Sequence, residues 1–149
     1  KIMSDGELKQ IQLNNGLEPF GLGTGAAVAD IDNDGILELL VSHGESGQQP
    51  LSLYKANIDS SFRFVRILPK TAFNAPARGV TVILNTNMRN HAKTIDAGSG
   101  YLCQMEPVAH YGLRKDEKVK SVTIKWTDGS SDNFKINQLN KTYVFSKGI

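Results

Sequence analysis

Four carboxylates are spaced closely in the nine-residue segment D-I-D-N-D-G-I-L-E, which runs from residue 30 to residue 38. Carboxylates at the first, third, fifth and ninth positions of such a loop can converge on one hard cation, and the carbonyl at the seventh position can add a further oxygen ligand. The glycine at the sixth position permits the sharp turn, because it lacks a Cβ. Many carboxylates on a short loop suit Ca²⁺ better than Mg²⁺. We therefore expect a calcium site with the ligands Asp30, Asp32, Asp34, the carbonyl of Ile36, and Glu38.

An EF-hand loop begins in the same way, but it requires a glutamate at its twelfth position and a helix on either side. The twelfth position here is Val41, and the flanking segments 25–29 and 39–42 are short apolar runs of strand length. We therefore expect the loop to join two β-strands. The remaining alternative is a solvated acidic hairpin turn without a metal ion.

Short runs of strand length recur along almost the whole chain, and no long window shows a clear helical period. This pattern predicts an all-β protein. The segment Thr127-Asp-Gly-Ser130, which lies between two alternating runs, predicts a hairpin turn. The expected strands are 8–13, 26–29, 37–42, 51–54, 62–68, 80–85, 93–96, 119–126, 131–136 and 142–145.

The expected strands fall into two units. Residues 1–68 contain a strand, metal loop and strand module of the size of one β-propeller blade, and blades bury their faces only against neighbouring blades. We therefore expect this region to belong to a larger propeller, and the chain, which begins at Lys1, to be a processed or partial piece. Residues 69–149 are expected to form a second, sandwich-like β domain.

The overall charge is low, at +2 for 149 residues, which does not indicate binding to nucleic acid or to an anionic membrane surface. Residues 114–118 alternate bases with acids and are expected to form a solvated face. No apolar run approaches the roughly 20 residues that cross a bilayer, so we expect no membrane span.

Two parts of the chain resemble known modules. The run from Phe20 to Val41, FGLGTGAAVADIDNDGILELLV, resembles an FG-GAP repeat, the calcium-binding blade of integrin-α-like propellers. Three runs resemble the ASPIC/UnbV domain: ARGVTV at 77–82, DAGSGYLCQMEPVAHYGL at 96–113 and VTIKWTDG at 122–129. The order of the two modules is similar to that in the cartilage acidic protein family.

This resemblance implies a secreted, extracellular matrix or cell-surface glycoprotein that binds other proteins, is not an enzyme, and uses calcium structurally. It also implies the five ligands named above, with Glu38 standing where the FG-GAP pattern usually has aspartate. The alternatives are a carbohydrate-binding β module that uses exposed aromatic residues such as Tyr101 or Tyr111, and an accessory domain of an enzyme.

Other polar residues have competing interpretations. One interpretation is a hydrolase site formed by Ser99, Glu106 and His110, but no G-x-S-x-G elbow is present. We prefer a structural role for the histidine, packed against Tyr111. His110 and the single cysteine could form a Cys–His dyad or bind a metal ion together. Two residues alone lack the further ligands of a zinc site.

Four further expectations concern single residues. Cys103 is either a small buried hydrophobe or half of a bridge to another chain. Asn140, in the sequon Asn-Lys-Thr, is a possible glycan site in a secreted protein. Asp96 and Asp128 are expected to accept hydrogen bonds from turn amides. Arg66 and Arg78 are the expected contacts for an acidic ligand.

Overall fold

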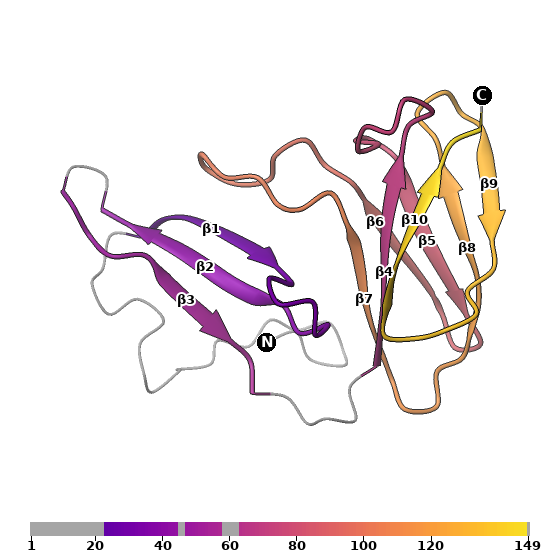
Figure 1. The fold of residues 1–149 in the computed structure, drawn as a ribbon, viewed down its shortest axis with the longest axis horizontal. Coiled ribbons are helices and arrows are strands. Elements are labelled where there is room, and N and C mark those ends of the chain that lie inside the picture. Colours follow the sequence, from indigo (N-terminus) through magenta and orange to yellow (C-terminus); the bar gives the residue numbers. More distant parts are fainter. Residues whose placement is uncertain (1–22, 45–46, 58–62, 149) are drawn as a thin grey trace.

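The computed structural model describes residues 23–44, 47–57 and 63–148. Within these ranges the chain is all-β, with ten strands in three sheets and no helix (Figure 1). The fold class predicted from the sequence is confirmed to that extent. The expected strand at 8–13 lies outside the described residues.

The first sheet is an antiparallel three-stranded sheet in the order β1-β2-β3. Its strands are β1 (Gly23–Ala29), β2 (Glu38–His43) and β3 (Ser52–Lys55). The acidic loop joins β1 to β2, so the predicted strand–loop–strand arrangement is confirmed. The pairing of Glu38 with Lys55 brings the end of β3 beside the end of the loop.

The rest of the described chain forms two sheets that pack face to face (Figure 1). One sheet has the order β10-β4-β7, with β10 (Lys141–Ser146) parallel to β4 (Arg63–Lys70) and β7 (Ala109–Leu113) antiparallel to it. The other has the order β6-β5-β8-β9. Its strands are β5 (Thr81–Thr86), β6 (Asn90–Thr94), β8 (Val119–Lys125) and β9 (Ser131–Phe134).

The apolar core lies between these two sheets. Alternate residues of a strand point to the same face, and the inward residues of β4, β5, β7 and β8 are almost completely buried. They are Val65, Ile67, Val82, Leu84, Ala109, Tyr111, Leu113, Val122 and Ile124. Burial of this continuous core makes residues 63–148 a two-sheet sandwich.

The predicted hairpin turn at 127–130 joins β8 to β9. Gly129 has a φ of 88° there, and its amide donates to the carbonyl of Trp126 at 3.1 Å. Both expected aspartate caps are confirmed, because Asp96 accepts from the Gly98 amide at 3.2 Å and Asp128 accepts from the Ser130 amide at 3.0 Å.

Strand β7 was not predicted, and the expected packing of His110 against Tyr111 is wrong. Neighbouring residues of a strand face opposite sides of its sheet. Tyr111 therefore enters the core, where its hydroxyl donates to the carbonyl of Val82 at 2.8 Å, while the His110 ring stacks on Phe64 at a centroid distance of 5.9 Å.

Strand β4, with the sequence RFVRILPK, is buried on both faces along most of its length, which agrees with apolar residues at consecutive positions. Val65 and Ile67 enter the sandwich core, whereas Phe64 and Arg66 face outward and are nevertheless buried. The acidic loop covers this outward face. At Gly35, where φ is 87°, an added Cβ would lie 2.0 Å from a ring carbon of Phe64, so only glycine permits this approach.

Candidate metal centre

The four carboxylates of the loop share one pattern of hydrogen bonding. Each uses one of its two oxygens to accept a hydrogen bond from a main-chain amide of the loop, which fixes the carboxylate in place. The donor and acceptor pairs are Gly35 to Asp30 Oδ2 (3.1 Å), Asp34 to Asp32 Oδ1 (3.3 Å), Ile36 to Asp34 Oδ1 (2.8 Å) and Ile31 to Glu38 Oε2 (2.8 Å). The second oxygen of each carboxylate remains for another partner.

Three of these second oxygens lie beside the ammonium group of Lys55. Its Nζ is 2.5 Å from Asp32 Oδ2, 2.6 Å from Asp34 Oδ2 and 3.2 Å from Glu38 Oε1. The contact with Glu38 is an ion pair without hydrogen-bond geometry. The fourth second oxygen, Asp30 Oδ1, is buried and has no hydrogen-bond partner among the described residues.

These contacts shift the pKa values of Asp34 and Lys55, which are both partly exposed. The hydrogen bond from Lys55, followed by that from the Ile36 amide, lowers the pKa of Asp34 below its ordinary value. Hydrogen bonds to Asp32 and then to Asp34 raise the pKa of Lys55. Both groups are therefore charged at neutral pH, and the ammonium group of Lys55 offsets part of the negative charge of the loop.

The loop fits a divalent cation. One oxygen each of Asp30, Asp32 and Glu38 lie within 4.8 Å of one another, a separation at which they can share one ion. Asp34 is not one of these three residues, but its Oδ2 contacts the same Lys55 ammonium group as Asp32 and Glu38 do. A buried carboxylate oxygen without a donor is costly unless a cation or hydrogen bond compensates it. Ile36 lies in the same loop, where its amide donates to Asp34.

Arg66 lies behind the loop and connects it to the sandwich. Its guanidinium is 3.0 Å from Asp30 Oδ2, 3.0 Å from Asn33 Oδ1 and 2.5 Å from Glu106 Oε2. Glu106 also accepts from the Asp30 amide at 3.4 Å. The side chain of Arg66 is 4% exposed, so the expectation that it contacts an acidic external ligand is wrong.

The residues of the hydrolase alternative serve other contacts. Glu106 is engaged by Arg66 and by the amide of Asp30, and His110 stacks on Phe64. Burial, followed by the nearby positive charge of Arg66, lowers the pKa of His110, which makes the ring neutral at physiological pH. This arrangement assigns both side chains to the packing of the acidic loop on the sandwich.

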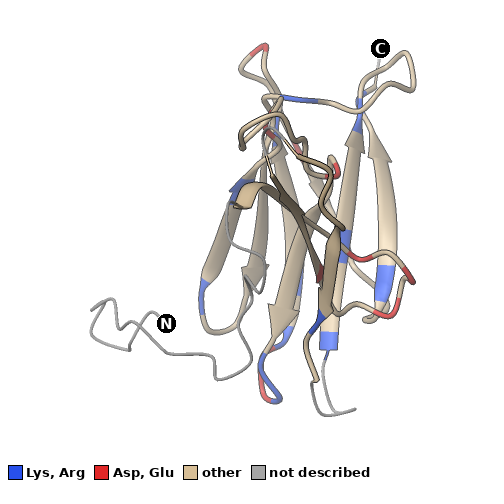
Figure 2. Ribbon diagram, turned by 90° about the vertical axis from the view of Figure 1, so that its left-hand side faces the viewer, with Lys and Arg blue, Asp and Glu red and all other residues tan. Residues whose placement is uncertain are grey.

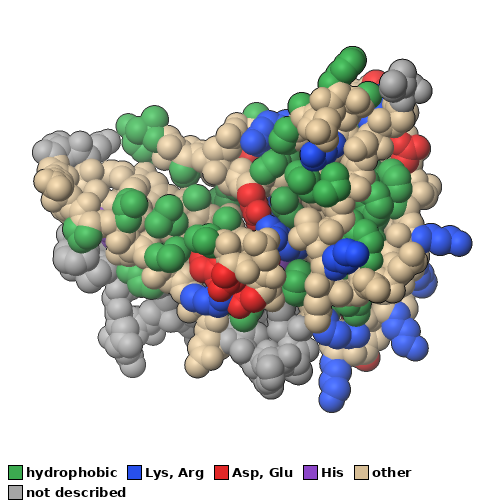
Figure 3. Space-filling view, in the orientation of Figure 1, with side chains coloured by type: hydrophobic (Ala, Val, Ile, Leu, Met, Phe, Trp, Pro, Cys, Tyr) green, Lys and Arg blue, Asp and Glu red, His purple; other side chains and the backbone are tan. Residues whose placement is uncertain are grey.

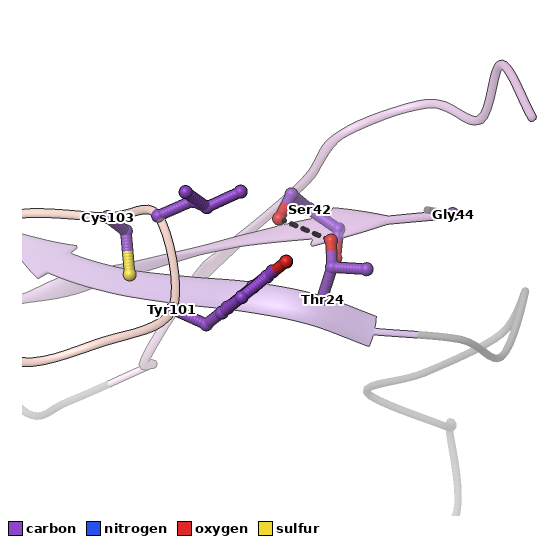
Figure 4. A pocket seen from close by; sticks show the side chains of 6 residues that line it. Thr24, Ser42, Gly44, Tyr101 and Cys103 are labelled. Carbon is purple, nitrogen blue, oxygen red and sulfur yellow. Dashed lines mark hydrogen bonds between the residues drawn. The ribbon is translucent and has the colours of Figure 1, made fainter. Parts of the chain in front are cut away.

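A small cavity of about 320 Å³ lies between the first sheet and the loop at 98–104 (Figure 4). Tyr101, Cys103, Thr24 and Ser42 line it, and the hydroxyls of Thr24 and Ser42 are 3.1 Å apart. Cys103 is half-buried, with its Sγ 3.1 Å from the carbonyl of Ala26. An added Cβ at Gly25 would lie 2.9 Å from the carbonyl of Tyr101, so the loop approaches β1 closely.

One buried carboxylate was not predicted from the sequence. The segment 114–118 was expected to be a solvated face, and its other four residues are exposed, but Glu117 is fully buried, so the expectation is wrong for this residue. Its oxygens accept from Thr86 Oγ1 (2.9 Å), Arg89 Nε (3.2 Å) and the Arg114 amide (3.2 Å), and one lies 2.7 Å from His91 Nε2. The side-chain partners Thr86, Arg89 and His91 lie 26–31 residues away in the sequence, so no local pattern identified them.

Acidic residues lie mainly in the loops of the molecule, and lysines and arginines occur both on strands and in loops (Figure 2). In the space-filling view, acidic side chains gather beside basic ones at the junction of the first sheet and the sandwich, and apolar side chains are spread over the first sheet (Figure 3). The exposed apolar residues of this region are Ile31, Leu40, Leu51 and Leu53. Leu40 and Leu53 are a cross-strand pair. In the described ranges, no helix has the length and hydropathy needed to cross a membrane.

Comparison with known proteins identifies the second part of the chain. The family described as ASPIC and UnbV matches residues 70–149. The chain is 49% identical over 123 residues to cartilage acidic protein 1 of Mus musculus and of Homo sapiens, and 47% identical over 127 residues to that of Xenopus tropicalis.

These matches cover 82–85% of this chain but 18–20% of the relatives, so the chain spans about a fifth of their length. The family match includes the described strands from β5 to β10, which supply both sheets of the sandwich. The chain therefore belongs to the ASPIC and UnbV family, and most of this chain is similar to part of cartilage acidic protein 1.

Proposed function

We propose that the protein binds Ca²⁺ through the loop at 30–38, and that the ion has a structural role. One observation carries this proposal: each of the four loop carboxylates has one oxygen fixed by a loop amide and a second oxygen available to a cation. Asp30, Asp32, Asp34 and Glu38 supply these oxygens, and the Ile36 carbonyl is the proposed fifth ligand. Calcium accepts this number of oxygen ligands in flexible geometry.

A bound calcium ion would stabilise the contact between the loop and the sandwich. A ligand that binds only the folded state adds RT ln(1 + [L]/Kd) to stability, which is about 2.7 kcal/mol at a ligand concentration of 100 times Kd. The loop covers the outward face of β4 through Gly35 and Asp30. Fixing the loop therefore also fixes the first sheet against β4.

We propose that the first sheet is one blade of an FG-GAP propeller. Leu40 and Leu53 form an exposed apolar pair on this sheet, and Leu51 is 66% exposed beside it. A neighbouring blade would bury such a surface. The relatives are about five times longer than this chain, which leaves ample length for further blades.

The protein is proposed to act outside the cell, in the matrix or at the cell surface, by binding other proteins and without catalysis. The name of cartilage acidic protein 1 supports a tissue-matrix setting. Asn140, which has a positive φ of 56°, is the proposed glycan position. The carbohydrate-binding alternative loses Tyr111, which is buried, and retains only Tyr101 as an exposed aromatic residue of the pair.

Isothermal titration calorimetry with Ca²⁺ tests the metal site. We expect one site in the wild-type protein, with a thermal unfolding midpoint that rises when Ca²⁺ replaces EDTA. Asp32→Asn removes a proposed ligand whose side chain is 57% exposed, so the fold should survive while calcium affinity falls by at least about tenfold, equivalent to 1.4 kcal/mol.

The matched control is Asp116→Asn, which changes an exposed aspartate on a loop of the sandwich and should leave calcium affinity unchanged. A wild-type protein that shows neither heat of binding nor a calcium-dependent midpoint would refute the proposed metal site.

A further inference from the structure

Two cations of the chain neutralise the acidic loop, and they differ in how firmly they are held. Arg66 is 4% exposed and is enclosed by Asp30, Asn33 and Glu106. Lys55 is the last residue of β3, and its side chain is 38% exposed. Arg66 is thus part of the packed interior, whereas Lys55 reaches the loop from the solvent side.

The contacts of Lys55 are made with the oxygens that a metal ion would need. Its ammonium group touches Asp32 Oδ2, Asp34 Oδ2 and Glu38 Oε1, which are the oxygens that the loop amides leave free. A divalent cation bound by the same oxygens would occupy the same space and repel the ammonium group. The Lys55 ammonium group and the metal ion therefore exclude each other.

The position of Lys55 makes this exclusion reversible. Its backbone is fixed opposite Glu38 by the pairing of β3 with β2, so the ammonium group stays within reach of the loop. A lysine side chain has a flexible four-carbon stem, and the exposed head can turn into water when another cation arrives. Arg66, which contacts the other oxygen of Asp30, need not move.

We propose that Lys55 is the resident counter-ion of the acidic loop and that Ca²⁺ must displace it in order to bind. This inference rests on the proposed function and concerns how the same site is regulated. With Lys55 in place, the loop keeps its shape in the absence of calcium. The same contact reduces calcium affinity, because only molecules with the lysine displaced are competent to bind.

The test compares Lys55→Met with the wild-type protein by calorimetry with CaCl₂ and by thermal unfolding in EDTA and in saturating Ca²⁺. If Lys55 occupies the loop in about nine molecules of ten, its removal should lower the calcium Kd roughly tenfold. The midpoint in EDTA should fall because three carboxylates lose their counter-ion, so the rise on adding calcium should be larger than in the wild type.

Two further variants act as controls. Lys120→Met removes an exposed lysine from β8 and should change neither the calcium Kd nor the calcium-dependent midpoint. Lys55→Arg keeps the positive charge and should remain close to the wild type in calcium affinity. A lower calcium Kd in Lys55→Met but not in Lys55→Arg would show that the charge of this side chain, and not its packing, reduces calcium affinity.

The outcomes distinguish the two proposals. If Lys55→Met and wild-type protein bind Ca²⁺ with equal affinity, the displacement of Lys55 is refuted and the metal site stands. If neither protein binds Ca²⁺, the proposed metal site fails and the displacement fails with it. If only Lys55→Met binds Ca²⁺, Lys55 blocks the loop permanently, and both its reversible displacement and calcium binding by the wild-type protein are refuted.

Discussion

Glu117 shows how a single buried charge is accommodated in the sandwich. Burial raises the pKa of its carboxyl, but the hydrogen bonds from Arg89, His91, the Arg114 amide and Thr86 together lower it more, so the net pKa lies below the ordinary value of 4.5. The carboxylate is therefore charged at neutral pH. Its donors come from two segments, the β5–β6 hairpin and the residues before β8, so Glu117 ties these two segments together.

We predict that Glu117→Gln destabilises the protein by about 3 kcal/mol, the order found when one member of a buried ion pair is removed. Chemical denaturation at pH 7 measures this loss. Asp116→Gln changes the exposed neighbouring residue and should alter stability by less than about 0.5 kcal/mol. Equal losses in the two variants would contradict the assigned role of Glu117.

The same pair of proteins has a defined pH dependence. A carboxyl with a lowered folded pKa contributes its full stability above its unfolded pKa and loses it as the pH falls toward the folded value. The stability difference between wild type and Glu117→Gln should therefore be constant above about pH 5.5 and should shrink below pH 4.5.

The chemistry of the acidic loop was visible in the sequence because its carboxylates and its glycine lie within nine consecutive residues. The roles of Lys55 and Arg66 were not, because each comes from a different strand and reaches the loop only after the sheets have formed. Glu117 was missed for the same reason. Local spacing predicts a carboxylate cluster on one loop but not the counter-ions that other segments supply.

At the scale of elements, the acidic loop depends on one glycine that both turns the chain and permits close packing. Gly35 has a φ of 87°, and an added Cβ would lie 2.0 Å from the ring of Phe64. Gly129, in the turn between β8 and β9, has nearly the same φ of 88° but no heavy atom within 4 Å of an added Cβ. The pair therefore separates backbone strain from packing.

We predict that Gly129→Ala costs about 1–2 kcal/mol, from left-handed backbone strain alone. Gly35→Ala should cost about 2–5 kcal/mol, because it adds about 1–3 kcal/mol of overpacking against Phe64 to the same strain. Equilibrium denaturation of both variants measures the difference. Equal losses would mean that the loop moves away from β4 without penalty.

Most strands were predicted from their alternating residues, but β7 was not. Its sequence, AHYGL, contains a glycine and a histidine, and it follows a glycine-rich run that suggests a loop. The strand forms because Ala109, Tyr111 and Leu113 fill the core and pair with β4, which is a tertiary effect. Propensity alone is a weak guide to strands for this reason.

At the scale of the whole molecule, the first sheet and the sandwich are joined by a buried ionic contact. Arg66 belongs to the central strand of a sandwich sheet, and Asp30 begins the loop of the first sheet. Their side chains are 4% and 0% exposed, so water cannot replace either partner. Removing one charge from such a pair leaves the other buried without compensation.

We predict that Arg66→Met destabilises the protein by about 3–5 kcal/mol. The control is Arg78→Met, which should cost less than about 1.5 kcal/mol. It removes a half-buried arginine that donates to the carbonyl of Asp96. Hydrogen exchange locates the effect. The Gly35 and Ile31 amides, whose acceptors Asp30 and Glu38 depend on a docked loop, should exchange faster in Arg66→Met, while the amides of β5 and β8 should remain protected.

The distribution of that exchange decides what Arg66 contributes. If the loop amides open while the sandwich amides stay protected, Arg66 holds two separable units together, and thermal unfolding should split into two transitions. If all amides exchange faster to the same extent, the first sheet and the sandwich unfold as one body, and the contact supports global stability instead. Unchanged exchange at Gly35 would show that Phe64 and Glu106 hold the loop on β4 without Arg66, contrary to the prediction.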